Sequence, residues 1–568
     1  MTKFDHPSIR PTAPARSGVA AFVASMAVLL AMLVLGHEGR RVAQMLVLAV
    51  PPFVWLLWPV RRRWVRRLRL GVLGLWSAAF IADATVRAYL WQAYEAAPDG
   101  AMVLVAAANT TARESREFLT MYWQPIAAWS LGGTAAWLLL IAVVRHGAQG
   151  MPRHALAPGG ASRLPVWLRF AIALLLSLAL VSYVSKPWRR LHPVLFWTQW
   201  ESKVQEVRAG WDDHQRARDL ALERARSARP VTAVAGPSTV VLVITDSVNR
   251  DNMSLYGYGR ATTPQLQARK AALGDGLVVM RNAWSVDAST VPALNNIFHF
   301  GRPKAMGATD ATAGTDVAAA PHAIALARAA GYKVWWISNH DDLAIEQSHA
   351  RLADVTELIN RTPGRSSASL DHEVVDCVQE AIEDTSSDRK LIVVHLMGAH
   401  PHYSSRFPKD ANPFDDAPDG VEAAMLASGR SAWVRRFRTQ YDAAMLYHDS
   451  VVAQLLDITR QGGAPNGRRA WMYLSDHGQE VGHGSDNAGH SAVSESGYRI
   501  PTVLWRQPQA LLPSGRDQAP FRSDWSAFTL MGLLGIDWTG ADPSRDALHP
   551  RYQWQAPVLP APVASFAR

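Results

Sequence analysis

The pair Asp476-His477 is the sharpest chemical signal in the chain, because a carboxylate beside an imidazole offers ligands that suit zinc. The pair follows the apolar run Trp471–Leu474, in the segment SDHGQEVGHG. Adjacent ligands are feasible because the chain can turn sharply at Gly478. An Asp-His-Gly triplet by itself is more typical of a turn or a helix cap, so the zinc prediction depends on ligands from elsewhere in the chain.

Polar residues of the same kinds follow three other apolar runs: Val240–Ile244 before Thr245-Asp246, Val334–Ile337 before SNHDD, and Leu391–Leu396 before MGAHPHY. Asp246 supplies a second carboxylate. His400, His483 and His490 supply further imidazoles near the same edge. Four strand ends that carry Asp, His or Asn indicate one converged site, and they favour a metal site over a simple turn.

A candidate nucleophile, Thr290, lies in the segment WSVDASTVPALNNIF. Its place before Val-Pro-Ala-Leu, at the start of a predicted helix, is first of all that of an N-cap. A helix N-terminus also lowers the cost of an alkoxide and of an incoming phosphate, and bound zinc would activate the hydroxyl. Both roles can hold together, and Ser289 remains a second candidate for the nucleophile.

The elements that must position these residues are short apolar runs alternating with stretches of helical period, between about Val240 and Asp537. The runs are Val240–Ile244, Leu277–Met280, Val334–Ile337, Leu391–Leu396, Trp471–Leu474 and Thr502–Trp505. This alternation predicts an α/β domain with a mainly parallel sheet and helices on both faces. Sites in such sheets form beyond the carboxyl ends of the strands, where the polar residues above fall.

Five apolar segments precede this domain, each near the ~20 residues that a helix needs to cross a membrane. They are roughly Gly18–Leu35, Val42–Val60, Leu70–Trp91, Trp123–Val144 and Val166–Ser185. The Arg-rich loop Arg61–Arg69 lies inside by the positive-inside rule, which also places the N-terminus in the cytoplasm and everything after Ser185 outside. In a bacterial inner membrane, the outside is the periplasm. Asp83 and Arg87 have the i,i+4 spacing of an internal ion pair.

The predicted organisation is a transmembrane domain of five helices at 1–185, an interfacial helical linker at 186–236 and a periplasmic domain at 237–568. The formal charge is +10 and the pI about 9.8, but the clustering of Arg between apolar segments indicates membrane topology rather than nucleic-acid binding. The one cysteine, Cys377, excludes a disulfide framework and a Cys-based zinc site. We expect a monomer.

The order and spacing of several motifs resemble the membrane-bound phosphoethanolamine transferases of Gram-negative bacteria, which belong to the alkaline phosphatase/sulfatase superfamily. The motifs are DSVNRDNMSLYGYGRATTPQL, HLMGAHPHYSSRFP, YDAAMLYHDSVV, YLSDHGQEV and AGHSAVSESGYRIPTVLW. The resemblance covers nearly the whole chain. It implies zinc-dependent transfer of phosphoethanolamine from phosphatidylethanolamine, through a covalent phospho-threonine, to lipopolysaccharide (core or lipid A) or another periplasmic acceptor. With lipopolysaccharide as acceptor, it also implies a link to polymyxin resistance.

The resemblance also assigns individual residues. Its zinc site consists of Asp246, Thr290, Asp476 and His477. Thr290 would accept the phosphoethanolamine, and a second metal ion is compatible with the pattern. His400 and His490 would line the substrate or second-metal site and transfer protons. Thr110 and Glu114, in the external loop between the third and fourth segments, would contact the lipid substrate.

Two departures from the family pattern stand out. The first ligand of the family is usually Glu, whereas here it is Asp246. The segment STVPAL and the single cysteine resemble the branch that modifies the lipopolysaccharide core more than the disulfide-rich lipid A branch. The alternatives are another enzyme of the superfamily (a glycerol-phosphate transferase or a phosphodiesterase) or a non-catalytic membrane scaffold. A sulfatase with a Cys nucleophile is excluded, because Cys377 lies in the helical context DCVQEA.

Overall fold

The computed structural model describes residues 13–57, 60, 62–94, 96–110, 112–149, 166–210, 214–300, 321–340, 343–359, 369–415, 419–508 and 515–559. The chain divides into two compact units. The first contains the N-terminal helices up to Gln92, with Ala97–Asp99 and Arg116–Gln205. The second contains Glu206–Arg568 together with two short earlier segments, Ala93–Ala96 and Gly100–Ser115.

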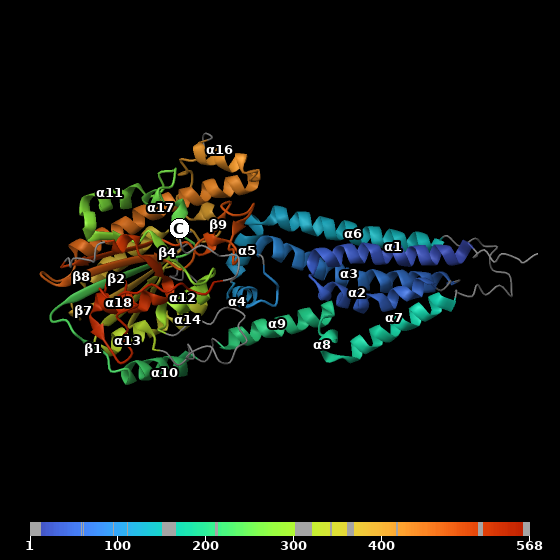
Figure 1. The fold of residues 1–568 in the computed structure, drawn as a ribbon, viewed down its shortest axis with the longest axis horizontal. Helices are drawn as coiled ribbons and strands as arrows, with labels where there is room; N and C mark the ends of the chain where they lie inside the picture. The colour runs from blue at the N-terminus through green and yellow to red at the C-terminus, as the bar shows by residue number, and fades with distance from the viewer. Residues whose placement is uncertain are drawn as a thin grey trace, which may run out of the picture. The chain divides into compact units, whose positions relative to one another are not determined.

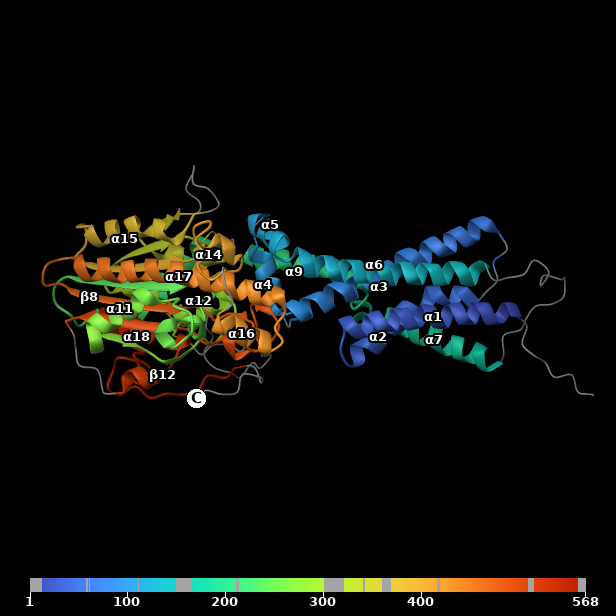
Figure 2. The ribbon, with the colours of Figure 1, turned by 90° about the horizontal axis from the view of Figure 1, so that it is seen from above.

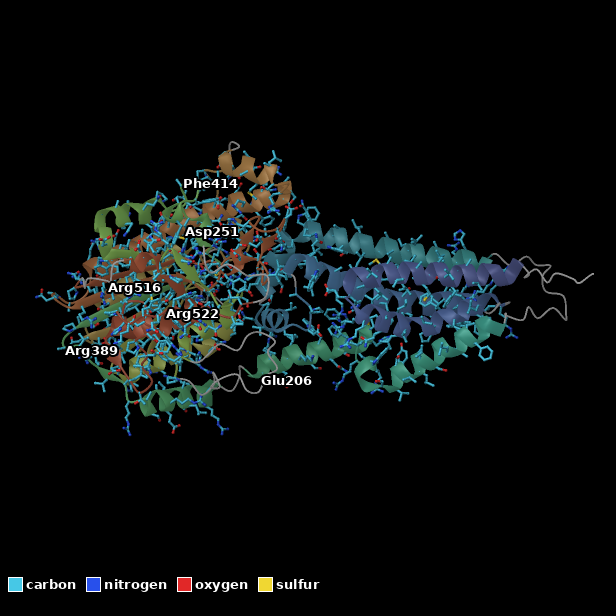
Figure 3. All side chains as sticks on the ribbon, viewed as in Figure 1. Glu206, Asp251, Arg389, Phe414, Arg516 and Arg522 are labelled. Atoms are coloured by element: carbon cyan, nitrogen blue, oxygen red, sulfur yellow. The ribbon has the colours of Figure 1, made fainter. Side chains whose placement is uncertain are left out.

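All five predicted apolar segments form helices in the first unit: α1 (Ala13–Gly36), α2 (Arg40–Phe53), α3 (Arg63–Tyr94), α6 (Trp123–Gln149) and α7 (Val166–Val184). Among the described residues, four helical spans are long and apolar enough to cross a membrane: those of α1, α3 and α6, and α2 together with the 3-10 turn Val54–Leu57 that continues it. The described apolar part of α7, Ile172–Val184, is shorter. Carbon atoms dominate the side chains on these helices, whereas nitrogen and oxygen are dense in the second unit, where Arg389, Arg516 and Arg522 lie (Figure 3).

The predicted ion pair in α3 is confirmed and belongs to a larger buried network. Arg87 Nε donates to both carboxylate oxygens of Asp83 at 3.0 and 3.1 Å. His37 Nε2 lies 3.2 Å from the same carboxylate, and Trp197 Nε1 donates to it at 3.0 Å. Trp197 belongs to α9 (Pro193–Gly210), so the network fastens this part of the predicted linker to α3. Such pairing is what a charge needs in an apolar bundle.

The second unit is built on a seven-stranded sheet. Its strand order is β3 (Leu277–Val279), β11 (Thr502–Gln507), β8 (Arg468–Ser475), β2 (Ser238–Thr245), β7 (Arg389–Leu396), β5 (Lys333–Ser338) and β6 (Val355–Leu358). The six predicted apolar runs are six of these strands. Strand β11 is antiparallel to both of its neighbours, and the other pairings are parallel. The missed strand, β6, is a half-exposed edge strand with no continuous apolar run.

Helices cover both faces of the sheet, as predicted for a mainly parallel sheet. One face carries α11 (Pro264–Leu273), α15 (Val374–Glu383) and α17 (Ala432–Gln461), which lie side by side (Figure 2). The other carries α12 (Thr290–Phe298), α13 (Ala323–Ala329) and α18 (Ser526–Leu534) (Figure 1). Every residue of β2 is buried, because this strand has neighbours on both sides and helices above and below.

The register of the central strands brings the polar strand ends together. Thr245, the last residue of β2, is level with Leu396 of β7 and Ser475 of β8. The amide of Asp476 continues the pairing and donates to the carbonyl of Thr245 at 3.0 Å. Because these strands are parallel neighbours, the residues that follow them meet at one edge of the sheet.

Candidate metal centre

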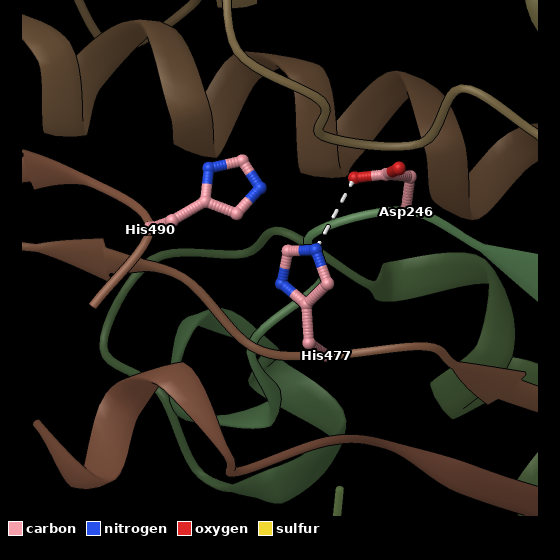
Figure 4. Close-up of side chains that lie close together, drawn as sticks. All are labelled: Asp246, His477 and His490. Carbon is pink, nitrogen blue, oxygen red and sulfur yellow. Dashed lines mark ion pairs between the residues drawn. The ribbon is translucent and has the colours of Figure 1, made fainter. Parts of the chain in front are cut away.

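Three side chains meet at the edge of the sheet beyond β2 and β8. Thr290 Oγ1 donates to Asp246 Oδ2 at 2.9 Å and lies 3.3 Å from His477 Nε2. His477 Nε2 lies 3.8 Å from Asp246 Oδ1, the pair joined by the dashed line in Figure 4. Asp246 and His477 are completely buried. The structure therefore brings together a carboxylate, an imidazole and a hydroxyl that are far apart in the sequence.

Asp476 adds a second carboxylate to this set, and only one of its two oxygens accepts hydrogen bonds. Its Oδ1 accepts hydrogen bonds from the amides of Ser247 and His477 at 3.1 and 2.6 Å. Its Oδ2 is buried, has no hydrogen-bond partner and lies 3.6 Å from His477 Nε2. An unpaired carboxylate oxygen in a buried site is costly, and it points to a cation as its partner.

The tautomer of His477 also fits a metal ligand. Its Nδ1 lies 2.7 Å from the carbonyl oxygen of Gly478. A carbonyl only accepts hydrogen bonds, so Nδ1 carries a proton and Nε2 is the ring nitrogen that can offer a lone pair to a metal ion. A second ring nitrogen fixed to a backbone carbonyl is the usual arrangement of a metal-ligating histidine.

The predicted histidines fall into two groups. His490, which follows the short strand β10 (Ala488–Gly489), packs beside His477 with ring centroids 4.7 Å apart and the ring planes tilted by 47°. Asp246, His477 and His490 have ligand atoms within 4.8 Å of one another (Figure 4). His400 lies close enough for its imidazole to act on the charge of Asp246, and its Nδ1 is buried without a partner. His483 does not join this group, because its Nε2 lies 2.7 Å from Asn252 Oδ1.

The two candidate nucleophiles differ in where their hydroxyls point. Ser289 is the N-cap residue of α12 and Thr290 is the first helical residue, so the expectation that Thr290 itself is the N-cap is wrong. The Ser289 hydroxyl donates to Asp287 Oδ1 at 3.1 Å. The Thr290 hydroxyl faces Asp246. Only Thr290 of the two is hydrogen-bonded to a predicted zinc ligand.

Two glycines permit the close backbone contacts that shape the site. Gly398, after β7, has φ +52°, and a Cβ there would lie 2.9 Å from the carbonyl oxygen of Asp246. The next amide, that of Ala399, donates to this oxygen at 3.0 Å. A Cβ on Gly478 would lie 2.1 Å from the carbonyl oxygen of Ser496. The turn predicted after the Asp476-His477 pair thus requires glycine because of close packing.

The motif that follows β2 is held by α17. Tyr441 of this helix donates its hydroxyl to the carbonyl of Ser247 at 2.7 Å and accepts from the amide of Asn249 at 2.8 Å. Ser247 has a left-handed backbone, φ +61°, which a residue with a Cβ adopts only when its surroundings enforce it. That conformation turns the Ser247 amide towards Asp476.

Without a bound cation, Asp246 favours its ionised form and Asp476 favours its protonated form. Burial alone would raise the pKa of Asp246, but the imidazoles of His400, His477 and His340 outweigh burial and hold it low. Burial, followed by the negative charge of Asp246, raises the pKa of Asp476. A divalent cation between them would favour the ionised form of both. The orphaned Asp476 oxygen, the His477 tautomer and the Thr290 hydroxyl all fit zinc in this position.

Other residues are placed as follows. Thr110 ends α4 (Ala101–Asn109) and donates its hydroxyl to the carbonyl of Ala106 at 2.7 Å, and Glu114 lies in the first turn of α5 (Ala112–Met121). Their roles stay predictions.

Asp371, which the sequence did not single out, accepts from the amides of Met397 and Gly398 at 3.0 and 2.8 Å and so holds the loop after β7. Its segment carries no motif that could have revealed this role.

Comparison with known proteins decides the family. Residues 238–536 match the sulfatase family. The chain belongs to this family. Phosphoethanolamine transferase EptC of Escherichia coli strain K12 is 30% identical over 331 residues, which are 56% of this chain and 54% of EptC. The chain therefore matches about half the length of this curated relative.

Two solved structures extend the likeness. The C-terminal periplasmic domain of EptC from Escherichia coli, in a complex with Zn, is 28% identical with a TM-score of 0.50, covering 58% of this chain and 91% of that one. Full-length EptA from Neisseria meningitidis is 17% identical with a TM-score of 0.55, covering 95% and 99%, and it shows the fold of both units. The predicted family resemblance is confirmed, and identity is higher to EptC than to EptA, as the sequence indicated.

Proposed function

We propose that this sulfatase-family protein is a zinc-dependent transferase of the bacterial inner membrane. It would move phosphoethanolamine from phosphatidylethanolamine to lipopolysaccharide or another periplasmic acceptor, by way of a covalent intermediate on Thr290. The observation that carries the proposal is the Thr290 hydroxyl, which donates to Asp246 and lies 3.3 Å from His477 Nε2 at the start of α12. The relative EptC is named a phosphoethanolamine transferase, and its solved domain contains Zn, which supports both the reaction and the metal.

Zinc would be held by Asp246, Thr290, Asp476 and His477. When bound there, it supplies positive charge that lowers the pKa of a hydroxyl and stabilises phosphoryl oxygens. The chain contributes the position of the nucleophile. The first turn of α12 directs the Thr290 oxygen towards the site, and the unpaired amides of the helix start favour an incoming phosphate.

In the first step, the Thr290 hydroxyl, which donates to Asp246 Oδ2, releases its proton to water as Oγ1 attacks phosphorus. The bond between phosphorus and the diacylglycerol oxygen breaks, and that oxygen takes a proton from His400. In the second step, an acceptor hydroxyl attacks the phospho-threonine and gives its proton to His400. The phosphorus–Oγ1 bond breaks, and Oγ1 takes up a proton from water. Burial lowers the pKa of His490 to about 3, so this ring is neutral near pH 7 and lines the phosphoryl pocket.

A membrane lipid as donor explains why apolar helices accompany the catalytic domain. Thr110 and Glu114 would contact this lipid. Support comes from the segment Gly100–Ser115, which forms one compact unit with the sulfatase-like domain. The carbonyl of Ala108 in this segment accepts from Arg208 Nε and Nη2 at 3.0 and 2.8 Å.

Mass spectrometry tests the proposal on the purified protein and on lipopolysaccharide from cells. Purified protein incubated with phosphatidylethanolamine should gain one phosphoethanolamine group on Thr290, whereas a glycerol-phosphate transferase would gain a different mass. Lipopolysaccharide from cells with the protein should carry phosphoethanolamine that cells without it lack. Thr290→Ala should abolish both products. Ser289→Ala, which removes a hydroxyl turned towards Asp287, is the matched control and should retain them. Full transfer by Thr290→Ala would refute the proposal.

A further inference from the structure

The start of α3 carries a dense group of arginines. Arg62 and Arg63 lie at the beginning of the helix, and Arg66 and Arg67 follow one turn later. Three of these side chains are exposed and that of Arg66 is half-buried. These four residues are named the basic turn. They belong to the first compact unit, and the proposed reaction uses none of them.

The basic turn has no carboxylate partner among the described residues. The chain contains no Asp or Glu from residue 39 to residue 82. The bundle carboxylates Asp83 and Asp99 pair with Arg87 and Arg41 instead. The amide of Arg66 donates to the carbonyl of Arg62 at 3.1 Å, so the four arginines form two pairs at helical i,i+4 spacing. Like charges at this spacing destabilise a helix, and an anion bound between them removes that cost.

A further arginine fixes the backbone of this region. Arg69 is 2% exposed, and its Nη1 donates to the carbonyl of Trp55 at 3.2 Å. Trp55 belongs to the 3-10 turn Val54–Leu57 that follows α2. The hydrogen bond therefore ties the beginning of α3 to the end of α2. The exposed guanidinium groups of the basic turn extend from a backbone that is held in place.

The position of the basic turn along α3 matches the headgroup layer of a bilayer. Arg67 and Arg87 are 20 residues apart on this helix, which is about 30 Å at the helical rise of 1.5 Å per residue. The hydrocarbon core of a bilayer is about 30 Å thick. If Arg87 lies near one boundary of the core, the basic turn therefore reaches the other. The positive-inside rule predicts that this second boundary is the cytoplasmic one.

Two exposed apolar side chains accompany the basic turn. Trp64 is 59% exposed and Leu68 is 51% exposed, and they are also one turn apart on α3. Trp is enriched where a helix leaves the hydrocarbon core, and Arg extends its charged group from there to the phosphates. A loop in water would leave both apolar side chains hydrated. Their exposure beside the arginines indicates a surface that faces lipid.

We propose that the basic turn binds the headgroup of an anionic phospholipid. Residues one turn apart have Cβ atoms about 5–6 Å apart, so two guanidinium groups can hold one phosphate between them through bidentate hydrogen bonds. The pairs Arg62–Arg66 and Arg63–Arg67 offer places for two phosphates. The ligand is a phosphodiester with net negative charge, as in phosphatidylglycerol or cardiolipin. Phosphatidylethanolamine does not fit, because its ammonium group would meet four positive charges and no carboxylate. The inference goes beyond the proposed function and does not rest on the zinc site.

The test is lipid binding by the full-length protein in micelles of a neutral detergent, measured by native mass spectrometry. Phosphatidylglycerol, cardiolipin and phosphatidylethanolamine with the same acyl chains are titrated separately. We expect both anionic lipids to bind more tightly than phosphatidylethanolamine. Cardiolipin should bind most tightly if both arginine pairs hold a phosphate, so the order of the two anionic lipids identifies the source of the headgroup.

A double variant and a matched control locate the binding. Each arginine at a membrane surface contributes about fivefold to the affinity for anionic lipid. Arg63→Gln/Arg67→Gln should therefore weaken the binding of anionic lipids about thirtyfold and leave that of phosphatidylethanolamine unchanged. Arg40→Gln/Arg190→Gln removes two exposed arginines elsewhere in the same unit. This control has the same net charge as the test variant, and its affinity should change by no more than about twofold.

A second measurement on the wild type covers the case in which the test variant fails to insert or fold. The affinity for anionic lipids should fall as the concentration of ammonium acetate rises, because salt screens exposed charges. Arginines that serve only to direct membrane insertion would give the folded protein no preference among the three lipids. Equal wild-type affinity for the three lipids would overturn the inference. An equal loss of affinity in the test variant and its control would overturn it as well.

Discussion

Replacing Gly398 by alanine tests whether the loop after β7 positions Asp246. An alanine at φ +52° costs about 1–2 kcal/mol, because its Cβ crowds the backbone in a left-handed conformation. The added Cβ would also lie 2.9 Å from the carbonyl oxygen of Asp246, a backbone atom that cannot rotate away. To reach ordinary van der Waals contact, the two segments must separate by about 0.5 Å.

That displacement predicts a loss of activity larger than the loss of stability explains. A misplacement of 1 Å costs about 100-fold in rate, so a shift of about 0.5 Å corresponds to about tenfold. Gly331→Ala is the matched control. Gly331 has φ +89° with nothing within 4 Å of an added Cβ, so it carries the backbone penalty without the contact.

The assay is transfer of phosphoethanolamine from labelled phosphatidylethanolamine, alongside thermal unfolding of each variant. We expect Gly398→Ala to lose more stability than Gly331→Ala, because only its Cβ meets a backbone atom. The transfer rate should fall about tenfold in Gly398→Ala and change little in Gly331→Ala. Equal rates in the two variants would refute the idea that the Gly398 backbone sets the place of Asp246.

Three further predictions follow from other contacts. Asp246→Glu adds a methylene to a fully buried side chain, so over-packing should cost about 1–3 kcal/mol and slow transfer; a variant as stable and active as the wild type would contradict this. Burial lowers the pKa of His448 from 6.5 to about 3, so its neutral form stabilises the fold fully above pH 6.5. This stability is lost at up to about 1.4 kcal/mol per pH unit as the pH falls below 6.5. His448→Gln should make unfolding less pH-dependent by one proton, and an unchanged slope would refute the assignment. Tyr441→Phe removes the hydroxyl that bonds the Ser247 carbonyl and the Asn249 amide, so it should lower the free energy of unfolding by about 1–3 kcal/mol; a loss well below this range would show that water replaces the hydroxyl.

Much of the sulfatase-family domain could be predicted from the local pattern of residues. Six apolar runs become strands, because a strand buried on both faces must be apolar along its whole length. The antiparallel orientation of β11 could not be predicted from the sequence, since an apolar run looks the same in either orientation. Strand β6 was missed because it is half-exposed and lacks that pattern. The helices of the first unit were predictable as apolar segments, although the described apolar part of α7, Ile172–Val184, is shorter than its predicted segment.

The residue types that gather at the site follow from the order of strands and polar residues along the chain. Asp246, Asp476 and His477 directly follow β2 and β8, and neighbouring parallel strands must bring such residues to one edge. Which hydroxyl faces them depends instead on how α12 packs against the sheet. Thr290 and Ser289 are adjacent, and the first turn of α12 sends one hydroxyl to Asp246 and the other to Asp287.

The tertiary structure also separated the histidines into those at the site and those elsewhere. His483 bonds to Asn252, whereas His340, from a segment the sequence marked only as polar, lies against Asp246. The contacts that place these side chains join residues far apart in the chain. Thr290 meets Asp246 across 44 positions and His477 across 187. Side-chain direction at such distances depends on packing between elements, which no local pattern of residues encodes.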